Sequence, residues 1–306
     1  IKNGSLLDTD QKIVLRQIDK ELSALKPKFT QNLLNATKTY ELHINDHKKV
    51  QGISESVLEI AAARTKEKGN EGWVFTLDAP VYKPVMANAK DRVIREKMHR
   101  AFNSRANGGE FSNKNILKRI ITLRNKRANL LGFASHAHYI LQNRMAETPE
   151  KVNDFIEDLL AKSLPKAKKE LDEIKIFARD KDDIDQLNPW DLEYYSGQMK
   201  KHIYGFDEED LRPYFKVEYV VKGVFKVASM LYGIKFEELK DIPVYASDVK
   251  VYRTTDSDGR FLGLLYMDLF PRETKRGGAW KTVLQHQGLI NGEMKRPHVL
   301  VSTNLT

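Results

Sequence analysis

The stretch that decides the predicted fold reads Phe261-Leu262-Gly263-Leu264-Leu265-Tyr266-Met267-Asp268, and it is soon followed by Lys275-Arg276-Gly277-Gly278-Ala279-Trp280. Residues 264–267 are apolar at consecutive positions, which is typical of a strand buried on both faces. The paired glycines carry no side chains, so they allow another backbone to approach closely. A bound peptide would use such a place, although Gly-Gly more often marks a tight turn between two elements.

Two further segments place this strand in a sheet. Residues 249–253 alternate in character and Asp256-Ser257-Asp258-Gly259 is a turn signal, so residues 249–268 are predicted to form a hairpin. A last strand is predicted from His298 to Thr303. The sequence therefore predicts a small antiparallel or mixed β-sheet near the C-terminal end.

The remaining sequence is predicted to be mostly helical, because its apolar residues recur every three or four positions. Residues 8–66 predict two long helices that are separated at Pro27. A helix that starts at Thr148-Pro149 has a capping hydroxyl and a proline in its first turn, and Pro165 is expected to kink or divide it. Shorter segments complete the prediction: a strand at 72–77 and helices at 91–105, 112–131, 135–141 and 217–233, and from Asn188-Pro189 onward.

The expected fold class is therefore mainly α, with multi-helical lobes and the small sheet. We expect three approximate parts: residues 1–110 as an N-terminal helical part, residues 111–240 as a helical lobe, and residues 241–306 as the sheet. A single continuous unit is the alternative to this division.

The composition is that of a globular protein with ample core-forming material, since 41% of the 306 residues are hydrophobic and 30% are charged. No apolar run is long enough to span a bilayer. The absence of cysteine excludes disulfides and thiolate metal ligands. The net charge of +9 would suit an acidic partner such as nucleic acid. Cations and acids alternate along the predicted helices, however, whereas phosphate backbones need positive charge gathered on one surface. Solvated helix faces are therefore favoured.

No catalytic motif is recognisable from residue chemistry alone. His43 and His47 have the spacing at which two side chains share a helix face and can bind a metal. No glutamate follows His43, and the charged neighbours favour an exposed surface instead of a metal site. H-E-x-x-H, P-loop, G-x-G-x-x-G and G-x-S-x-G patterns are all absent from the chain.

Four groups of residues, in this order along the chain, carry a resemblance to a known family. They are Arg124 with Ala128, Leu130, Leu131, Gly132 and Phe133; Arg144, Met145 and Ala146 with Thr148-Pro149; Trp190-Asp191 with Tyr194-Tyr195; and Tyr266, Asp268 and Pro271-Arg272 with residues 275–280. From about Leu117 onward the chain resembles the thimet oligopeptidase family of zinc metallopeptidases, most closely its bacterial peptidyl-dipeptidase Dcp branch.

The resemblance implies a zincin-like oligopeptidase fold, in which a deep channel separates two mostly helical lobes and the small sheet lies on one wall. It implies that the parent protein is a zinc peptidase that hydrolyses short peptides, as a peptidyl-dipeptidase or an oligopeptidase. In the family the H-E-x-x-H helix follows the strand that is predicted here before Thr306. The chain is therefore expected to be an internal, inactive fragment, with its catalytic residues beyond Thr306.

The same resemblance sets the expected partners and cofactor. We expect zinc in the parent protein, but no metal ligand and no cofactor in this chain. Short peptides are the expected partners of a monomer, without a membrane and without nucleic acid. The compartment is left open between the cytoplasm and the periplasm of a bacterium.

Part of the substrate channel is expected to remain in this chain. Main-chain hydrogen bonds could hold a peptide alongside residues 263–268 or at residues 276–279. The predicted substrate-binding residues are Gly263, Tyr266, Asp268, Arg276, Gly277, Gly278 and Ala279. Two alternatives stay open: these residues only hold the sheet against the helices, or the chain is a non-enzymatic basic helical binding module or scaffold.

Overall fold

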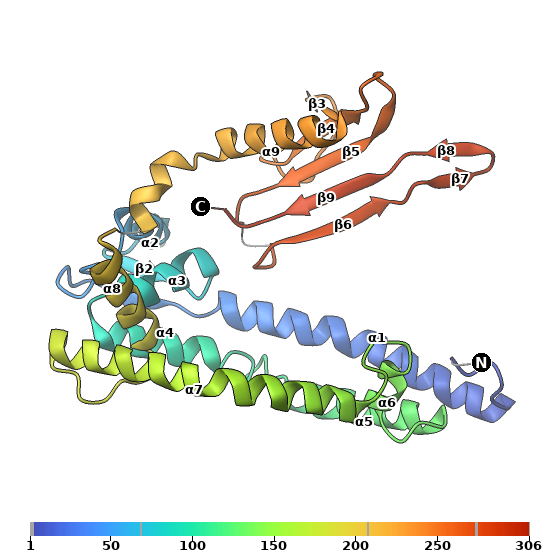
Figure 1. Cartoon of the computed structure of the whole chain (residues 1–306), viewed down its shortest axis with the longest axis horizontal. Coiled ribbons are helices and arrows are strands. Elements are labelled where there is room, and N and C mark those ends of the chain that lie inside the picture. Colours follow the sequence, from blue (N-terminus) through green and yellow to red (C-terminus); the bar gives the residue numbers. More distant parts are fainter. Residues whose placement is uncertain (1–2, 68, 207, 273–274, 306) are drawn as a thin grey trace. The chain divides into compact units, whose positions relative to one another are not determined.

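The structure is a computed structural model that describes residues 3–67, 69–206, 208–272 and 275–305 (Figure 1). It is mainly helical and contains small sheets, which confirms the predicted fold class. The chain divides into two compact units, Ile1–Leu77 with Pro84–Met199 and Asp78–Lys83 with Lys200–Thr306. Within the described ranges, no helix is both long enough and apolar enough to cross a membrane.

The first unit is built mostly from helices, and α3 and α8 cross its boundary with the second unit. Its elements are α1 (Thr9–Lys38), β1 (Leu42–Ile44), α2 (Glu55–Glu67), β2 (Trp73–Phe75), α3 (Ala79–Asn88), α4 (Arg92–Asn103), α5 (Lys114–Leu130), α6 (His136–Leu141), α7 (Pro149–Asp182) and α8 (Leu192–Tyr204).

Side-chain hydroxyls cap two of the helices, and the predicted cap at Thr148 is confirmed. The hydroxyl of Ser135 accepts a hydrogen bond from a backbone amide of α6, and Thr148 does the same for α7. The helix predicted at 112–131 begins later, at Lys114, because the cap position falls on Asn113. The Asn113 side chain makes no capping bond and instead bonds to α1, donating to the carbonyl of Phe29 at 2.9 Å.

The predicted helix break at Pro27 is also wrong, because α1 runs through it to Lys38. An interior proline costs a helix about 3 kcal/mol. Packing against α5, which lies alongside α1 in Figure 1, offsets this cost. Their shared core consists of Ile18, Leu22, Ile116, Ile120 and Leu123. Two ion pairs with N–O distances of 2.5 and 2.7 Å also join the helices: Arg119–Glu21 and Arg127–Asp19.

The second predicted helix is wrong between residues 40 and 54. Residues 42–44 form β1, which pairs antiparallel with the predicted strand β2 and buries Phe75 completely. The His43 Nε2 atom lies 2.6 Å from the carbonyl oxygen of Glu71, while the His47 ring packs edge-on against Trp73 at 4.5 Å. The two histidines therefore lie on a strand and in a turn rather than on one helix face.

A buried ion cluster joins α4 to the segment before α8. Asp191 is 0% exposed and accepts hydrogen bonds from Arg92 at 2.6 Å and from Arg95 at 2.9 Å. Burial raises the pKa of Asp191, but the hydrogen bonds from the two arginines outweigh burial and hold that pKa below its usual value. The cluster fixes the start of α8, whose Tyr194 and Tyr195 are buried.

Only the C-terminal half of α7 is packed. Ile174 and Ala178 form a buried cluster with the tyrosines of α8. The apolar stripe of the N-terminal half is more than half exposed at Phe155, Ile156, Leu159 and Leu160. Pro165 does not divide the helix, because α7 continues to Asp182.

Replacing Pro165 with alanine is expected to raise the midpoint of thermal unfolding, followed by far-ultraviolet circular dichroism. Proline lacks an amide donor and crowds the preceding turn, at a cost of about 3 kcal/mol relative to alanine. Pro165 is exposed, so its removal loses no packing. The matched control is Lys168→Ala at an exposed site on the same helix, for which a change within about 0.5 kcal/mol is expected. A lower midpoint for Pro165→Ala would contradict an unbroken α7.

The second unit contains a helical segment and most of the strands. Its elements are the 3₁₀ helix η1 (Glu208–Tyr214), α9 (Val217–Tyr232), β3 (Lys235–Leu239), β4 (Lys250–Thr255), β5 (Phe261–Asp268), β6 (Trp280–Gln285), β7 (Gly288–Ile290), β8 (Glu293–Lys295) and β9 (His298–Ser302). α9 ends at Gly233, as predicted, and packs on the sheet through Phe225, whose ring stacks on Phe236 at 4.1 Å.

The main sheet has the order β3-β4-β5-β9-β6 and is mixed. β5 pairs antiparallel with β4, as the predicted hairpin requires, and parallel with β9. β6 pairs antiparallel with β9 and lies at the edge, as Figure 1 shows. The sequence prediction missed β3, β6 and the β7–β8 hairpin. That hairpin turns at Asn291-Gly292, both with positive φ, which is a signal the sequence does contain.

Candidate substrate-binding site

The residues predicted to bind substrate lie at two levels of the main sheet. Asp268 at the end of β5 and Trp280 at the start of β6 both pair with Ser302 of β9. The start of β6, which follows the turn at residues 276–279, therefore lies level with the end of β5, with β9 between the two strands. Gly263 is five residues earlier on β5, a distance of about 16 Å at about 3.3 Å per residue. The structure thus brings together Asp268 and the turn, but leaves Gly263 apart.

The edge strands of the main sheet are β3 and β6, and β5 lies inside the sheet. Both backbone edges of β5 are occupied, by β4 on one side and by β9 on the other. A peptide therefore cannot add its main chain alongside residues 263–268, and the expectation of peptide binding at this strand is wrong. Tyr266 is half-buried and shares a sheet face with Asp268, because side chains alternate along a strand. Only its side chain is available to a ligand.

Gly263 is needed by the chain itself. A Cβ atom at this position would lie 2.5 Å from the carbonyl oxygen of Pro297, which accepts a hydrogen bond from the Leu264 amide at 3.0 Å. The Gly263 carbonyl accepts a hydrogen bond from the Thr254 hydroxyl at 2.7 Å. The backbone that comes close to Gly263 is thus that of Pro297, within the protein itself.

Asp268 is the centre of a buried charge network and is only 2% exposed. Arg272 donates to both of its carboxylate oxygens, at 2.7 and 2.8 Å. Lys275, also almost completely buried, donates to Asp268 Oδ1 at 2.8 Å and to the carbonyl oxygens of Asp268 and Phe270. The Tyr245 hydroxyl donates to Asp268 Oδ2 at 2.8 Å.

These contacts decide the charge state of Asp268. Burial raises the pKa of its carboxyl, but the hydrogen bonds from Arg272, Lys275 and Tyr245 outweigh burial and hold that pKa well below its usual range. Asp268 is therefore ionised and fully engaged inside the protein. This geometry agrees with the alternative that some of the predicted residues hold the sheet together.

The turn at residues 276–279 is different, because all four residues are exposed. Asn304 holds the turn by donating from its side chain to the carbonyl oxygens of Gly278 at 2.7 Å and Arg276 at 3.2 Å. Gly278 has φ of +98°, a conformation that other residues rarely adopt. Within the described ranges, the amides of residues 277–279 donate no hydrogen bond. The turn therefore offers backbone donors next to the open edge of β6.

Sequence reasoning missed part of this arrangement. Lys275 and Arg272 were noted as matching residues, but nothing in the sequence indicates that a lysine here is buried. Tyr245 and Asn304 were not singled out, because their contacts link segments more than twenty residues apart. A tyrosine or an asparagine in a loop carries no signal of such a partner.

The described residues contain no group of three or more histidine, cysteine, aspartate or glutamate side chains that could hold a metal ion. The donor set present here therefore does not fit a catalytic zinc, which needs three protein ligands.

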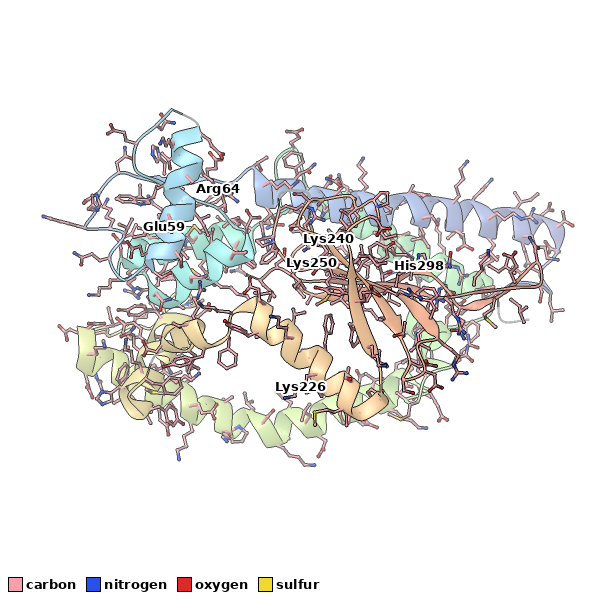
Figure 2. The ribbon with its side chains drawn as sticks, turned by 90° about the horizontal axis from the view of Figure 1, so that it is seen from above. Glu59, Arg64, Lys226, Lys240, Lys250 and His298 are labelled. Carbon is pink, nitrogen blue, oxygen red and sulfur yellow. The ribbon has the colours of Figure 1, made fainter. Side chains whose placement is uncertain are left out.

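Positive charge is spread over many elements. Lys226 on α9, Lys240 after β3 and Lys250 on β4 are labelled in Figure 2. Lys250 pairs with Glu238 at 3.4 Å. Four lysines of α7 pair with acids of the same helix, as at Lys162–Asp158 and Lys175–Asp172. This pairing supports solvated faces over a nucleic-acid surface.

The comparison with protein families gives one match, which covers most of the chain. The model of "Peptidase family M3" matches residues 85–306. The chain belongs to peptidase family M3. That membership confirms the resemblance drawn from Arg124, the Trp190-Asp191 group and the residues around Asp268.

Curated relatives within family M3 extend the match to most of the chain. Oligopeptidase A of Escherichia coli strain K12 is 36% identical over 294 residues, which cover 94% of this chain and 43% of the relative. The dipeptidyl carboxypeptidase of the same strain is 34% identical over 291 residues, with the same two coverages. A probable thimet oligopeptidase of Arabidopsis thaliana is 29% identical over 76% of this chain. The chain thus spans less than half the length of these relatives.

Replacing Asp268 with asparagine is expected to lower the stability of the second unit at neutral pH by about 3–5 kcal/mol, because Lys275 is left buried without its counter-ion. The pKa of Asp268 is lowered in the folded state, so its stabilisation is fully present above its unfolded pKa of about 4 and is lost as the pH falls further below that value. Urea unfolding across the acidic range measures both effects.

The control for this prediction is Asp258→Asn in the β4–β5 turn, where the side chain is exposed. The variant should unfold like the wild type. Equal stability of Asp268→Asn and wild type at neutral pH would contradict the network as described.

Proposed function

We propose that this chain supplies part of the substrate-binding surface of a family M3 metallopeptidase that hydrolyses short peptides. The observation that carries the proposal is the exposed turn at residues 276–279, which leads into the edge strand β6 and whose amides at 277–279 donate no hydrogen bond to a described residue. An extended peptide can accept hydrogen bonds from this turn and add its main chain to β6.

Recognition through the peptide backbone suits the relatives' names. Main-chain hydrogen bonds are made by every peptide, so such a site places little demand on the sequence of its ligand. Oligopeptidase A and dipeptidyl carboxypeptidase are both named for action on short peptides or their ends. We assign the whole protein to this substrate class, as an oligopeptidase or a peptidyl-dipeptidase.

Zinc chemistry is assigned to the whole protein and not to this chain. The sequence contains no H-E-x-x-H, the pattern that places two zinc ligands and a general base on one helix, and this motivates the assignment. The role proposed for the chain is to bind and orient the peptide. Gly277, Gly278 and Ala279 provide backbone donors, Arg276 stacks on Trp280 at 4.9 Å, and the Asp268 network holds the segment in place.

Gly278→Ala is expected to weaken the binding of a short capped peptide to the chain. A Cβ atom at φ of +98° is strained by about 1–2 kcal/mol, so the turn changes conformation and its donors move. The matched control is Gly292→Ala, which meets similar strain at φ of +81° in the β7–β8 turn. Isothermal titration with the peptide should show several-fold weaker binding for Gly278→Ala only. Equal binding by both variants would remove the turn from the site.

The chain alone is expected to show no peptidase activity and no tight one-to-one zinc binding. Zinc titration and a fluorogenic peptide assay measure the two properties separately. Tight stoichiometric zinc binding would contradict the assignment, and His43→Ala with His47→Ala would then identify whether these histidines take part.

A further inference from the structure

A pocket of about 560 Å³ in the first unit lies between α1, α5 and α6. Three cationic side chains line it, Lys26 from α1 and Arg124 and Arg127 from α5, together with His136 from α6. Asp19 is the single acid of the lining. The pocket therefore has a formal excess of two positive charges when His136 is neutral.

The cationic side chains of this pocket differ in how many interactions they make with the rest of the protein. Arg127 forms an ion pair with Asp19 at 2.7 Å and stacks on the Tyr139 ring at 4.8 Å. The side chains of Arg124 and Lys26 form neither a hydrogen bond nor an ion pair with any described residue. Arg124 is half-buried, so its charge is partly removed from water without a counter-charge in the protein.

The protonation of His136 is affected by the positive charges of this pocket. Its Nδ1 atom is buried and has no hydrogen-bond partner within the described residues. Burial lowers the pKa of His136, and the charges of Arg124, Arg127 and Lys26 lower it further. Arg124 and Lys26 have no counter-charge among the described residues, and the imidazole of His136 is held neutral. Such a pocket stabilises a bound negative charge.

We propose that this pocket binds a doubly charged oxyanion of the phosphate class, held by Arg124 and Lys26 beside His136. The guanidinium group can donate two parallel hydrogen bonds to a phosphate, and the lysine adds a point charge. A dianion matches the two unpaired charges. Arg124 is one of the residues that carry the family resemblance, and neither the helix packing nor peptide binding at the sheet explains it.

The first experiment is calorimetric titration of the full 306-residue chain with inorganic phosphate at constant ionic strength. Arg124→Gln should weaken binding about tenfold or more, as expected for loss of a charged hydrogen bond. Lys26→Gln should weaken it by a smaller factor. The controls are Arg119→Gln, on the same helix α5 as Arg124, and Lys28→Gln, on the same helix α1 as Lys26. Neither control residue lines the pocket, so both variants should leave the phosphate affinity unchanged.

A second arm separates two sources of the same chemistry. A nucleoside monophosphate is titrated in parallel with inorganic phosphate, since a pocket of this size admits either. Tighter binding of the nucleotide identifies a phosphoryl group on an organic molecule, and equal or weaker binding identifies the free anion. Either outcome supports the proposal provided that Arg124→Gln weakens the binding of both ligands.

Nuclear magnetic resonance titration of His136 gives a readout independent of heat. Lys26, Arg124, Arg127 and Asp19 are the charged groups of its pocket. Phosphate should raise the pKa of His136, because the anion offsets the cations, and Arg124→Gln should raise it without phosphate. Absence of phosphate binding, equal losses in the control variants, or chloride competing as well as phosphate would each overturn the proposal.

Discussion

The second unit depends on one constraint: the carboxylate of Asp268 is buried as an anion and must be matched by positive charge. Arg272 and Lys275 supply that charge from the segment that leaves β5. Because both must reach back to the strand that they follow, the chain cannot extend away from the sheet. It is held against the end of β5, where Asn304 fixes the next turn and β6 begins. The position of the proposed peptide-binding turn is thus a consequence of charge neutralisation.

The first unit repeats this arrangement around Asp191. A completely buried carboxylate is matched by two arginines of α4, and the start of α8 is fixed as a result. Both acids belong to the residue groups that carry the family resemblance. Part of that resemblance is therefore explained by protein stability rather than by contact with a substrate. Arg124 differs from these acids: it belongs to the same residue groups and is half-buried, but its side chain has no hydrogen-bond or ion-pair partner among the described residues.

The sequence predicted elements whose signals are local and missed those that depend on distant partners. The Thr148-Pro149 cap, the Gly233 helix end and the β4–β5 hairpin are all encoded within a few residues. The break at Pro27 was wrong because packing of α1 on α5 outweighs the cost of one proline. Residues 42–44 become a strand because β2, thirty residues later, provides a buried partner. Of the candidate site, the strand, the turn and the pairing of β5 with β4 were predicted, but the parallel pairing of the other β5 edge with β9 was not.

The parallel pairing of β5 with β9 has a consequence for the order in which the sheet assembles. β4 and β5 are joined by a short turn and can pair early, as local contacts do. β9 pairs with β5 across about thirty intervening residues, and it also lies between β5 and β6. The segment between β5 and β9 must therefore close into a loop, at a cost in conformational entropy, before contacts between the two strands can offset that cost. β6 pairs in the main sheet with β9 and not with β5, so the edge strand next to the proposed peptide site depends for its place on the long-range pairing of β9 with β5.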